Sequence, residues 1–92
     1  MNILQEIYTV IQDRQKNPKA DSYVCKLLDK GIDASLKKIG EEAAEVVIAA
    51  KNKKKDEVIW EVADLWFHSL VVMFQSGVTV EDVFKKLEER RK

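Results

Sequence analysis

Apolar residues recur at steps of three and four along most of the 92-residue chain, and nowhere do apolar and polar positions alternate strictly. Steps of three and four place side chains on one face of a helix, whereas a half-buried strand requires a period of two. The pattern therefore predicts an all-α chain without a sheet. Five helices are expected, over about residues 2–15, 22–30, 33–52, 56–76 and 80–90.

Residues that start or stop helices set these boundaries. Ser22 is suited to cap the start of the second helix, and Gly31 to adopt the left-handed conformation after its last turn. Asp33 is expected to cap the third helix, and Thr79 with Asp82 to form a capping box before the fifth. The remaining breaks are predicted at the Asn17-Pro18 pair, within residues 51–55 and at Gly77.

The helix expected over residues 56–76 carries apolar side chains around nearly its whole circumference. A helix of this kind is buried on nearly all sides. A chain of 92 residues makes one domain with a modest core, so a second copy is the expected cover for part of this helix. We therefore expect a single domain over residues 1–92 that forms a homodimer.

Two pairs of acidic residues interrupt the apolar pattern of the third and fourth helices. Glu42 and Glu45 form one pair, and Glu61 and Asp64 form the other. Both pairs have i,i+3 spacing, so each projects from one side of its helix. Carboxylates among apolar residues are rarely buried unless they are paired or bind a metal. If the two helices pack antiparallel, the four acids converge into an oxygen-rich pocket for Mg2+, with Mn2+ as the alternative.

Two further residues near the acidic pairs have two readings each. Glu41 lies toward the outer edge of the third helix and can support the site from beside it. His68 falls within the same arc of about 60° as Glu61 and Asp64, which makes it a candidate for substrate contact. A histidine on an apolar helix is more often a hydrogen-bonded core group, and most helical glutamates are simply solvated.

Several basic or polar side chains are candidates for phosphate contact. Lys38 lies along the same edge of the third helix as its acids, and Lys51 and Asn52 lie at the end of that helix. The simplest interpretation of residues 51–55 is a solvated turn. No glycine-rich phosphate loop is present in the sequence.

Composition excludes several classes of function. Sixteen basic and sixteen acidic residues give zero net charge, which argues against a general nucleic-acid binder. No run of 18 apolar residues is present, so no membrane span is expected. No secretion signal is evident, and a cytoplasmic protein is the expectation. The single cysteine, Cys25, cannot form an intramolecular disulfide and is interpreted as a small core residue rather than a reactive thiol.

The acidic pattern resembles that of a known superfamily. Glu41-Glu42-x-x-Glu45 followed by Glu61-x-x-Asp64 resembles the motif of the MazG-like all-α nucleoside triphosphate pyrophosphatases. Further segments, at residues 22–23, 30–31, 37–42, 45–52 and 61–68, are similar to the phosphoribosyl-ATP pyrophosphohydrolase family. The resemblance covers about residues 3–90. Val24 and the Trp66-Phe67 pair depart from the usual residues, outside the acidic core.

The resemblance implies a reaction, a fold and a set of site residues. The reaction is the Mg2+-dependent hydrolysis of phosphoribosyl-ATP to phosphoribosyl-AMP and pyrophosphate, the second step of histidine biosynthesis. The fold is a four-helix bundle core completed by dimerisation, with a functional link to phosphoribosyl-AMP cyclohydrolase. The implied metal ligands are Glu42, Glu45, Glu61 and Asp64, with Glu41 beside them, and Lys38, Lys51 and Asn52 match positions near phosphates. Our own mechanistic hypothesis is that a metal ion, or Glu41 or Glu42 as a catalytic residue, activates the attacking water, with His68 as a further candidate for substrate binding.

Two other functions remain open at this stage. A house-cleaning pyrophosphatase for other nucleoside triphosphates would share the acidic site and differ in the base it recognises. A helical dimerisation module without chemistry would gain stability from Leu or Ala at the acidic positions, and Mg2+ would not stabilise it. The acidic residues on apolar helices favour an enzyme.

Overall fold

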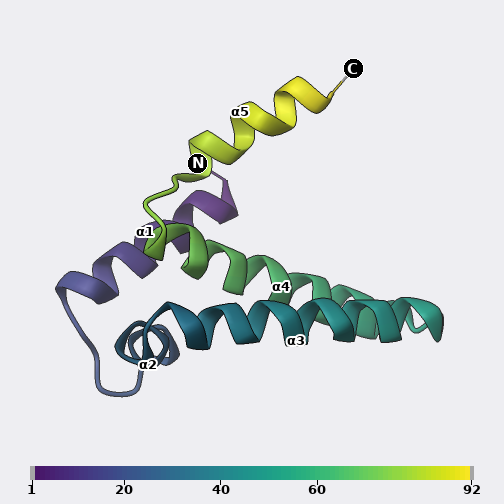
Figure 1. Ribbon diagram of the computed structural model, residues 1–92, viewed down its shortest axis with the longest axis horizontal. Helices are drawn as coiled ribbons and strands as arrows, with labels where there is room; N and C mark the ends of the chain where they lie inside the picture. The colour runs from purple at the N-terminus through teal and green to yellow at the C-terminus, as the bar shows by residue number, and fades with distance from the viewer. Residues whose placement is uncertain (1, 92) are drawn as a thin grey trace.

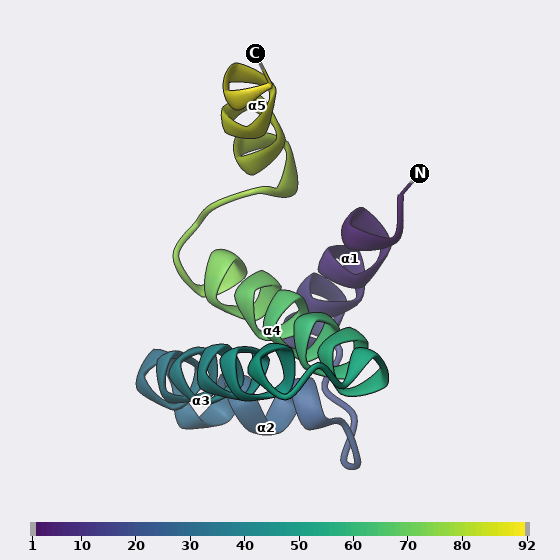
Figure 2. The same cartoon turned by 90° about the vertical axis from the view of Figure 1, so that its right-hand side faces the viewer.

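Five helices make up the regular structure of residues 2–91, the part of the chain that this computed structural model describes, and this part contains no strand. They are α1 (Ile3–Lys16), α2 (Tyr23–Lys30), α3 (Ile32–Lys51), α4 (Lys55–Gln75) and α5 (Val80–Arg90). α3 and α4 run side by side as a long antiparallel pair, α1 crosses α4, and α5 projects away from the pair (Figures 1 and 2). The prediction of an all-α fold is confirmed.

Local capping residues begin two of the helices as the sequence predicts. The Ser22 hydroxyl accepts a hydrogen bond of 3.2 Å from the backbone N–H of Cys25 at the start of α2. At the start of α5, the backbone N–H of Asp82 donates to the Thr79 hydroxyl at 3.1 Å, and the N–H of Thr79 donates to the Asp82 carboxylate at 2.9 Å. This reciprocal pair is the predicted capping box.

The predicted cap at Asp33 is wrong. α3 begins at Ile32 with Gly31 as the capping residue, and Asp33 lies inside its first turn. Gly31 has a φ of 86°, a value that an L side chain rarely adopts, so it can turn the chain directly between α2 and α3. The third helix therefore starts before Asp33 is reached. The carboxylate of Asp33 still stabilises the helix by lying near its N-terminus.

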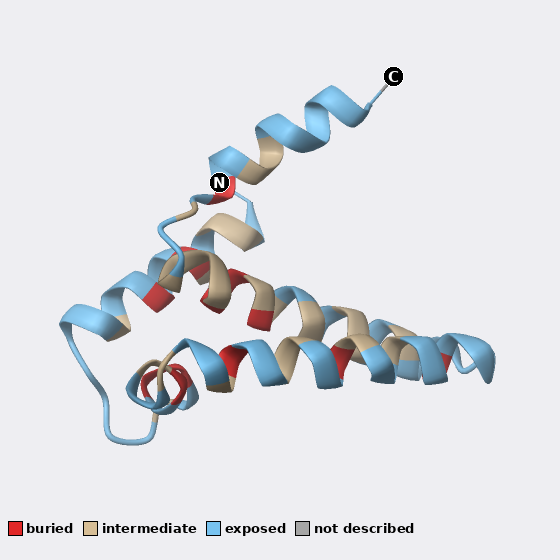
Figure 3. Cartoon of the chain, in the orientation of Figure 1, coloured by how far each residue is buried: buried red, intermediate tan, exposed pale blue. Residues whose placement is uncertain are grey.

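The core lies where α1, α2 and the C-terminal half of α4 meet, and Figure 3 shows buried positions gathered there. Its buried apolar residues are Tyr8, Ile11, Val24, Leu27, Leu70, Val71 and Val80. Tyr8 also donates a hydrogen bond of 2.8 Å from its hydroxyl to the carbonyl of Val78, which ties α1 to the segment before α5. Cys25 is buried in this region, as predicted for a small core residue.

The antiparallel pair extends beyond this core, and much of its apolar surface is exposed. On α4, Trp60 and Trp66 are 69% and 55% exposed, and on α3 Val47 is 67% exposed. Burial of α4 on nearly all sides is therefore not achieved within one chain. Among residues 2–91, no helix combines the length and apolar character that a membrane crossing requires.

Candidate active site

Three carboxylates meet between α3 and α4. Glu42 comes from α3, and Glu61 and Asp64 come from successive turns of α4. One oxygen from each carboxylate lies within 4.8 Å of the other two. Glu42 is only 8% exposed, and the other two are half-buried. The antiparallel packing of the two helices thus joins the two acidic pairs that the sequence places far apart.

The environment of Glu61 raises its pKa. Loss of solvent around Glu61 is the main cause, followed by a hydrogen bond shared with Glu42 and by the negative charges of Glu42, Asp64 and Glu45. A raised carboxyl pKa means that the ionised form is disfavoured. The group therefore binds either a proton or a cation more readily than an isolated carboxylate does.

Lys38 supplies the positive charge closest to the buried acid of α3. Its ammonium lies 3.5 Å from a Glu42 oxygen and 3.8 Å from a Glu41 oxygen. Burial alone would lower the pKa of Lys38, but Tyr23, Glu42 and Glu41 outweigh this effect and raise it. Lys38 therefore stays charged. One ammonium cannot neutralise three carboxylates, so the group keeps a negative balance.

This donor set has the chemistry that a hard divalent cation requires. All its ligand atoms are carboxylate oxygens, the donors that Mg2+ and Mn2+ prefer, and they come from two rigid helices. The residues Glu42, Glu61 and Asp64 fit such an ion on grounds of charge and spacing. They also leave room for ligands from a substrate, since Mg2+ in phosphate-binding sites usually takes only one or two protein carboxylates.

The remaining acidic candidates lie outside this group. Glu45 is exposed and does not join the three close carboxylates, although its charge contributes to the raised pKa of Glu61. Glu41 is exposed beside Lys38. The structure thus brings together three of the four acids expected to converge.

His68 is buried, and both nitrogens of its ring have hydrogen-bonding partners in the protein. Its Nδ1 lies 2.7 Å from the backbone carbonyl of Asp64, and its Nε2 lies 2.8 Å from the Tyr23 hydroxyl. A carbonyl can only accept, so Nδ1 carries a proton, and in the neutral ring Nε2 accepts from Tyr23. His68 therefore links α2 to the turn of α4 that bears Asp64. A direct contact with substrate would require one of these hydrogen bonds to break.

Lys51 and Asn52, the other phosphate candidates, lie at the C-terminal end of α3. Both are exposed, and within residues 2–91 no ion pair joins Lys51 to the carboxylates. The backbone N–H of Asn52 donates to the Ile48 carbonyl at 3.1 Å and closes the helix. Their role in phosphate binding stays a prediction.

Tyr23 is a neighbour of the site that the sequence pattern does not single out. It is the first residue of α2, is 46% exposed, and contacts both His68 and the aromatic ring of Phe67. The only signal for it in the sequence was its place in the Ser22-Tyr23 segment of the family resemblance. No spacing rule could have joined it to His68, which is 45 residues away.

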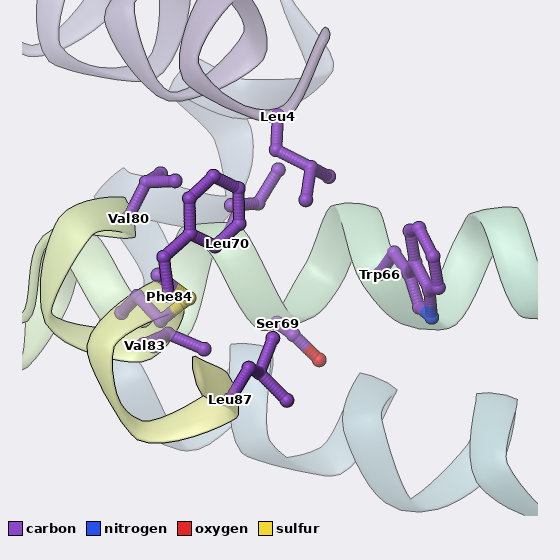
Figure 4. A pocket seen from close by; sticks show the side chains of 9 residues that line it. Leu4, Trp66, Ser69, Leu70, Val80, Val83, Phe84 and Leu87 are labelled. Atoms are coloured by element: carbon purple, nitrogen blue, oxygen red, sulfur yellow. The ribbon is translucent and has the colours of Figure 1, made fainter. Parts of the chain in front are cut away.

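An apolar hollow of about 300 Å³ lies apart from the carboxylates, between α4, α5 and the start of α1 (Figure 4). Phe84 and Leu87 of α5 and Leu70 of α4 line it, with Trp66 at its edge. It contains no acidic or basic side chain. The hollow therefore lacks the groups that would bind a phosphorylated substrate.

Comparison with known proteins gives matches over almost the whole chain. The family model for phosphoribosyl-ATP pyrophosphohydrolase matches residues 4–91. A phosphoribosyl-ATP pyrophosphatase of Methanoculleus marisnigri is 50% identical over 93 residues, covering 99% of this chain and 96% of that protein. One of Clostridium novyi is 47% identical over 92 residues, covering 100% of this chain and 84% of that protein. The histidine biosynthesis bifunctional protein HisIE of Thermoanaerobacter pseudethanolicus is 52% identical over 84 residues, 91% of this chain but only 39% of that protein.

Proposed function

The chain belongs to the phosphoribosyl-ATP pyrophosphohydrolase family, and we propose that its carboxylate group hydrolyses phosphoribosyl-ATP to phosphoribosyl-AMP and pyrophosphate. The observation that supports this proposal is the close approach of Glu42, Glu61 and Asp64 between two helices. One carboxylate oxygen from each of them lies within 4.8 Å of the other two. Relatives that the chain covers almost completely bear the name of this activity. The protein would then be a hydrolase of histidine biosynthesis.

Glu42, Glu61 and Asp64 would hold Mg2+, with Mn2+ as the alternative, and Glu45 would reach the outer side of the site. When bound, the cation neutralises charge on the triphosphate and on the leaving pyrophosphate. The raised pKa of Glu61 supports this assignment, because desolvation and then the neighbouring carboxylates disfavour its ionised form until a positive charge joins them.

The other polar residues would bind and orient the reacting groups. Lys38, held charged beside Glu42, is positioned to meet a phosphate oxygen. Glu41 lies outside the close carboxylates and is exposed, so it is available to accept the proton of the attacking water. Water would attack in line, the bond between the α- and β-phosphates would break, and pyrophosphate would leave with its electron pair.

The test is pyrophosphate release from phosphoribosyl-ATP, with Mg2+ and with a chelator, beside a panel of deoxynucleoside triphosphates. Mg2+-dependent release from phosphoribosyl-ATP, lost in Asp64→Asn and retained in Asp29→Asn, is the expected result. Asp29 is a suitable control because it is exposed on α2, away from the carboxylate group. Release from the deoxynucleotides instead would move the protein to the house-cleaning pyrophosphatases. No release from any of them would leave a dimerisation module.

We also propose that two copies of the chain pair through α3 and α4 into a four-helix bundle. Large apolar side chains remain exposed on both helices: Ile48 and Trp60 lie on the flank of the acids, whereas five others, Ile32, Leu36, Val47, Ile59 and Trp66, lie on the opposite flank. At 100° per residue, those on α3 fall roughly 80–140° past Glu42, and those on α4 fall roughly 140–160° past Glu61.

The two apolar flanks face the same side of the helix pair. α3 and α4 are antiparallel, and both flanks lie past the line of contact in the same rotational sense. Glu45 and Asp64 lie about 60° before that line on their helices and face the opposite side. A dimer formed through the apolar side would therefore bury Val47 and Trp66 while leaving the carboxylates open to substrate.

The fusion seen in bifunctional relatives supports a functional link to phosphoribosyl-AMP cyclohydrolase. In proteins named HisIE, the stretch that is similar to this chain makes up less than half of the protein. The cyclohydrolase would consume the phosphoribosyl-AMP that this reaction forms. We propose the cytoplasm as the location, because the substrate derives from ATP.

A further inference from the structure

Tyr23 is held rigidly although nearly half of it is exposed. Its hydroxyl bonds His68 Nε2 at 2.8 Å, and its ring stacks on Phe67 at 6.1 Å between centroids with an angle of 27°. The ring also meets the edge of His68 at 5.7 Å and 83°. Because Ser22 caps α2 directly before it, the backbone of Tyr23 is held as well. A side chain fixed from these directions loses little further freedom when a ligand contacts its open face.

Tyr23 also has a defined place relative to the carboxylates. Two hydrogen bonds, from its hydroxyl to His68 and from His68 to the backbone carbonyl of Asp64, join it to the turn of α4 that bears the Asp64 carboxylate. Lys38 also lies beside the carboxylates, with its ammonium 3.5 Å from a Glu42 oxygen. A nucleotide whose phosphates met the acids and Lys38 would have Tyr23 as a neighbour beyond His68, because His68 bonds both Tyr23 and the Asp64 turn.

We infer that the exposed face of the Tyr23 ring is a stacking platform for the adenine of the substrate, with its hydroxyl tethered to His68. This inference rests on the proposed function and names a residue for base recognition. An aromatic face attracts a planar base whatever the pattern of hydrogen bonds around it. The buried His68 is a positioning residue: it holds the ring through the hydroxyl and does not itself touch the base.

Substitution can separate the ring from its tether. Tyr23→Phe keeps the stacking face and removes only the hydrogen bond to His68, whereas Tyr23→Leu removes the face. Loss of base stacking typically weakens binding by about tenfold. We therefore expect the KM for phosphoribosyl-ATP to rise about tenfold in Tyr23→Leu. The increase in Tyr23→Phe should be smaller than this by a factor of at least about five. Tyr8→Phe is the matched control, since it loses one hydroxyl hydrogen bond of 2.8 Å in the core.

A spectroscopic test reports the contact without relying on turnover. The chain has two tyrosines, so labelling with 3-fluorotyrosine gives two fluorine resonances, assigned with Tyr8→Phe and Tyr23→Phe. α,β-Methylene-ATP carries adenine and resists cleavage between its α- and β-phosphates. With Mg2+ it should shift the Tyr23 resonance and leave that of the buried Tyr8 in place. Methylenediphosphonate, which lacks a base, should not reproduce the shift.

The outcomes separate the inference from the proposed function. If α,β-methylene-ATP competitively inhibits phosphoribosyl-ATP hydrolysis but leaves the Tyr23 resonance in place, the platform is refuted while the enzyme assignment stands. An equal shift with methylenediphosphonate would also refute it, because phosphate alone would then explain the change. If the chain neither hydrolyses phosphoribosyl-ATP nor binds the analogue, the proposed function fails and the platform with it.

Discussion

Trp66→Ala should dissociate the dimer that we propose, and Trp60→Ala should leave it intact. The two tryptophans make a matched pair: Trp66 and Trp60 are about one and two-thirds turns apart on α4 and are 55% and 69% exposed. They point about 120° apart around the helix. Only Trp66 lies on the apolar side of the helix pair, whereas Trp60 lies on the side of Asp64.

The expected loss follows from the exposed area of Trp66. A tryptophan presents up to about 250 Å² of surface, so a side chain that is 55% exposed leaves roughly 140 Å² for a partner to cover. At about 25 cal/mol per Å² this is worth about 3 kcal/mol, and a symmetric interface contains the residue twice. Alanine retains part of this surface, and association has opposing costs. A rise in the dimer Kd of at least about 100-fold is the resulting expectation.

Sedimentation equilibrium across a wide range of protein concentration measures this change directly. Circular dichroism should show the same helix content in both variants and in the original chain, so that dissociation is not confused with unfolding. A Trp66→Ala protein that remains as dimeric as the original would refute the assignment of this face. So would dissociation caused by Trp60→Ala alone, because the interface would then lie on the side of the carboxylates.

Three further predictions concern the carboxylates and the core. Asp64→Asn should lower turnover at least about 100-fold with unchanged helix content. Glu45→Gln should lower turnover less, because Glu45 lies outside the three close carboxylates. Equal losses of turnover in the two variants would contradict this order. In metal-free protein, the free energy of unfolding should rise as the pH falls from neutrality toward the raised pKa of Glu61, because the native state there binds a proton that the unfolded chain releases. Urea titrations of the original chain and of Glu61→Gln check this, since the variant should lose that rise. Ser35→Ala should leave stability unchanged or raise it by up to about 1 kcal/mol, because its buried hydroxyl has no hydrogen-bond partner within residues 2–91. Ser69→Ala, which loses a 2.7 Å hydrogen bond, should lower stability by about 1 kcal/mol in the same assay.

Features that depend on neighbouring residues could be predicted from the sequence. The helix starts at Ser22 and Thr79 follow from hydrogen bonds between residues three apart. The ion pair between Lys38 and Glu42 is likewise a contact across one helical turn. The prediction failed at Asp33, where two capping signals compete. Gly31 comes before Asp33 along the chain. Its positive φ lets the helix begin directly after it, at Ile32.

The content of the site depended on how α3 and α4 pack. The spacing of the acids placed each pair on one side of its helix, but it did not determine which members would meet across the interface. Packing brought Glu42 against Glu61 and Asp64 and left Glu45 in solvent. It also gave His68 a different neighbour from the one expected, because Tyr23 of α2 occupies its Nε2.

The amino-acid sequence by itself determined the helices, the caps at Ser22 and Thr79 and the two acidic pairs, because these features rest on interactions within one or two turns. Only the tertiary structure decided which flank of each helix is covered. α1 and α2 cover the α3–α4 pair over part of its length, and α5 projects away, so the apolar side with Val47 and Trp66 stays exposed in one chain. Burial depends on the direction from which other helices approach, and helical periodicity within a segment contains no information about that direction.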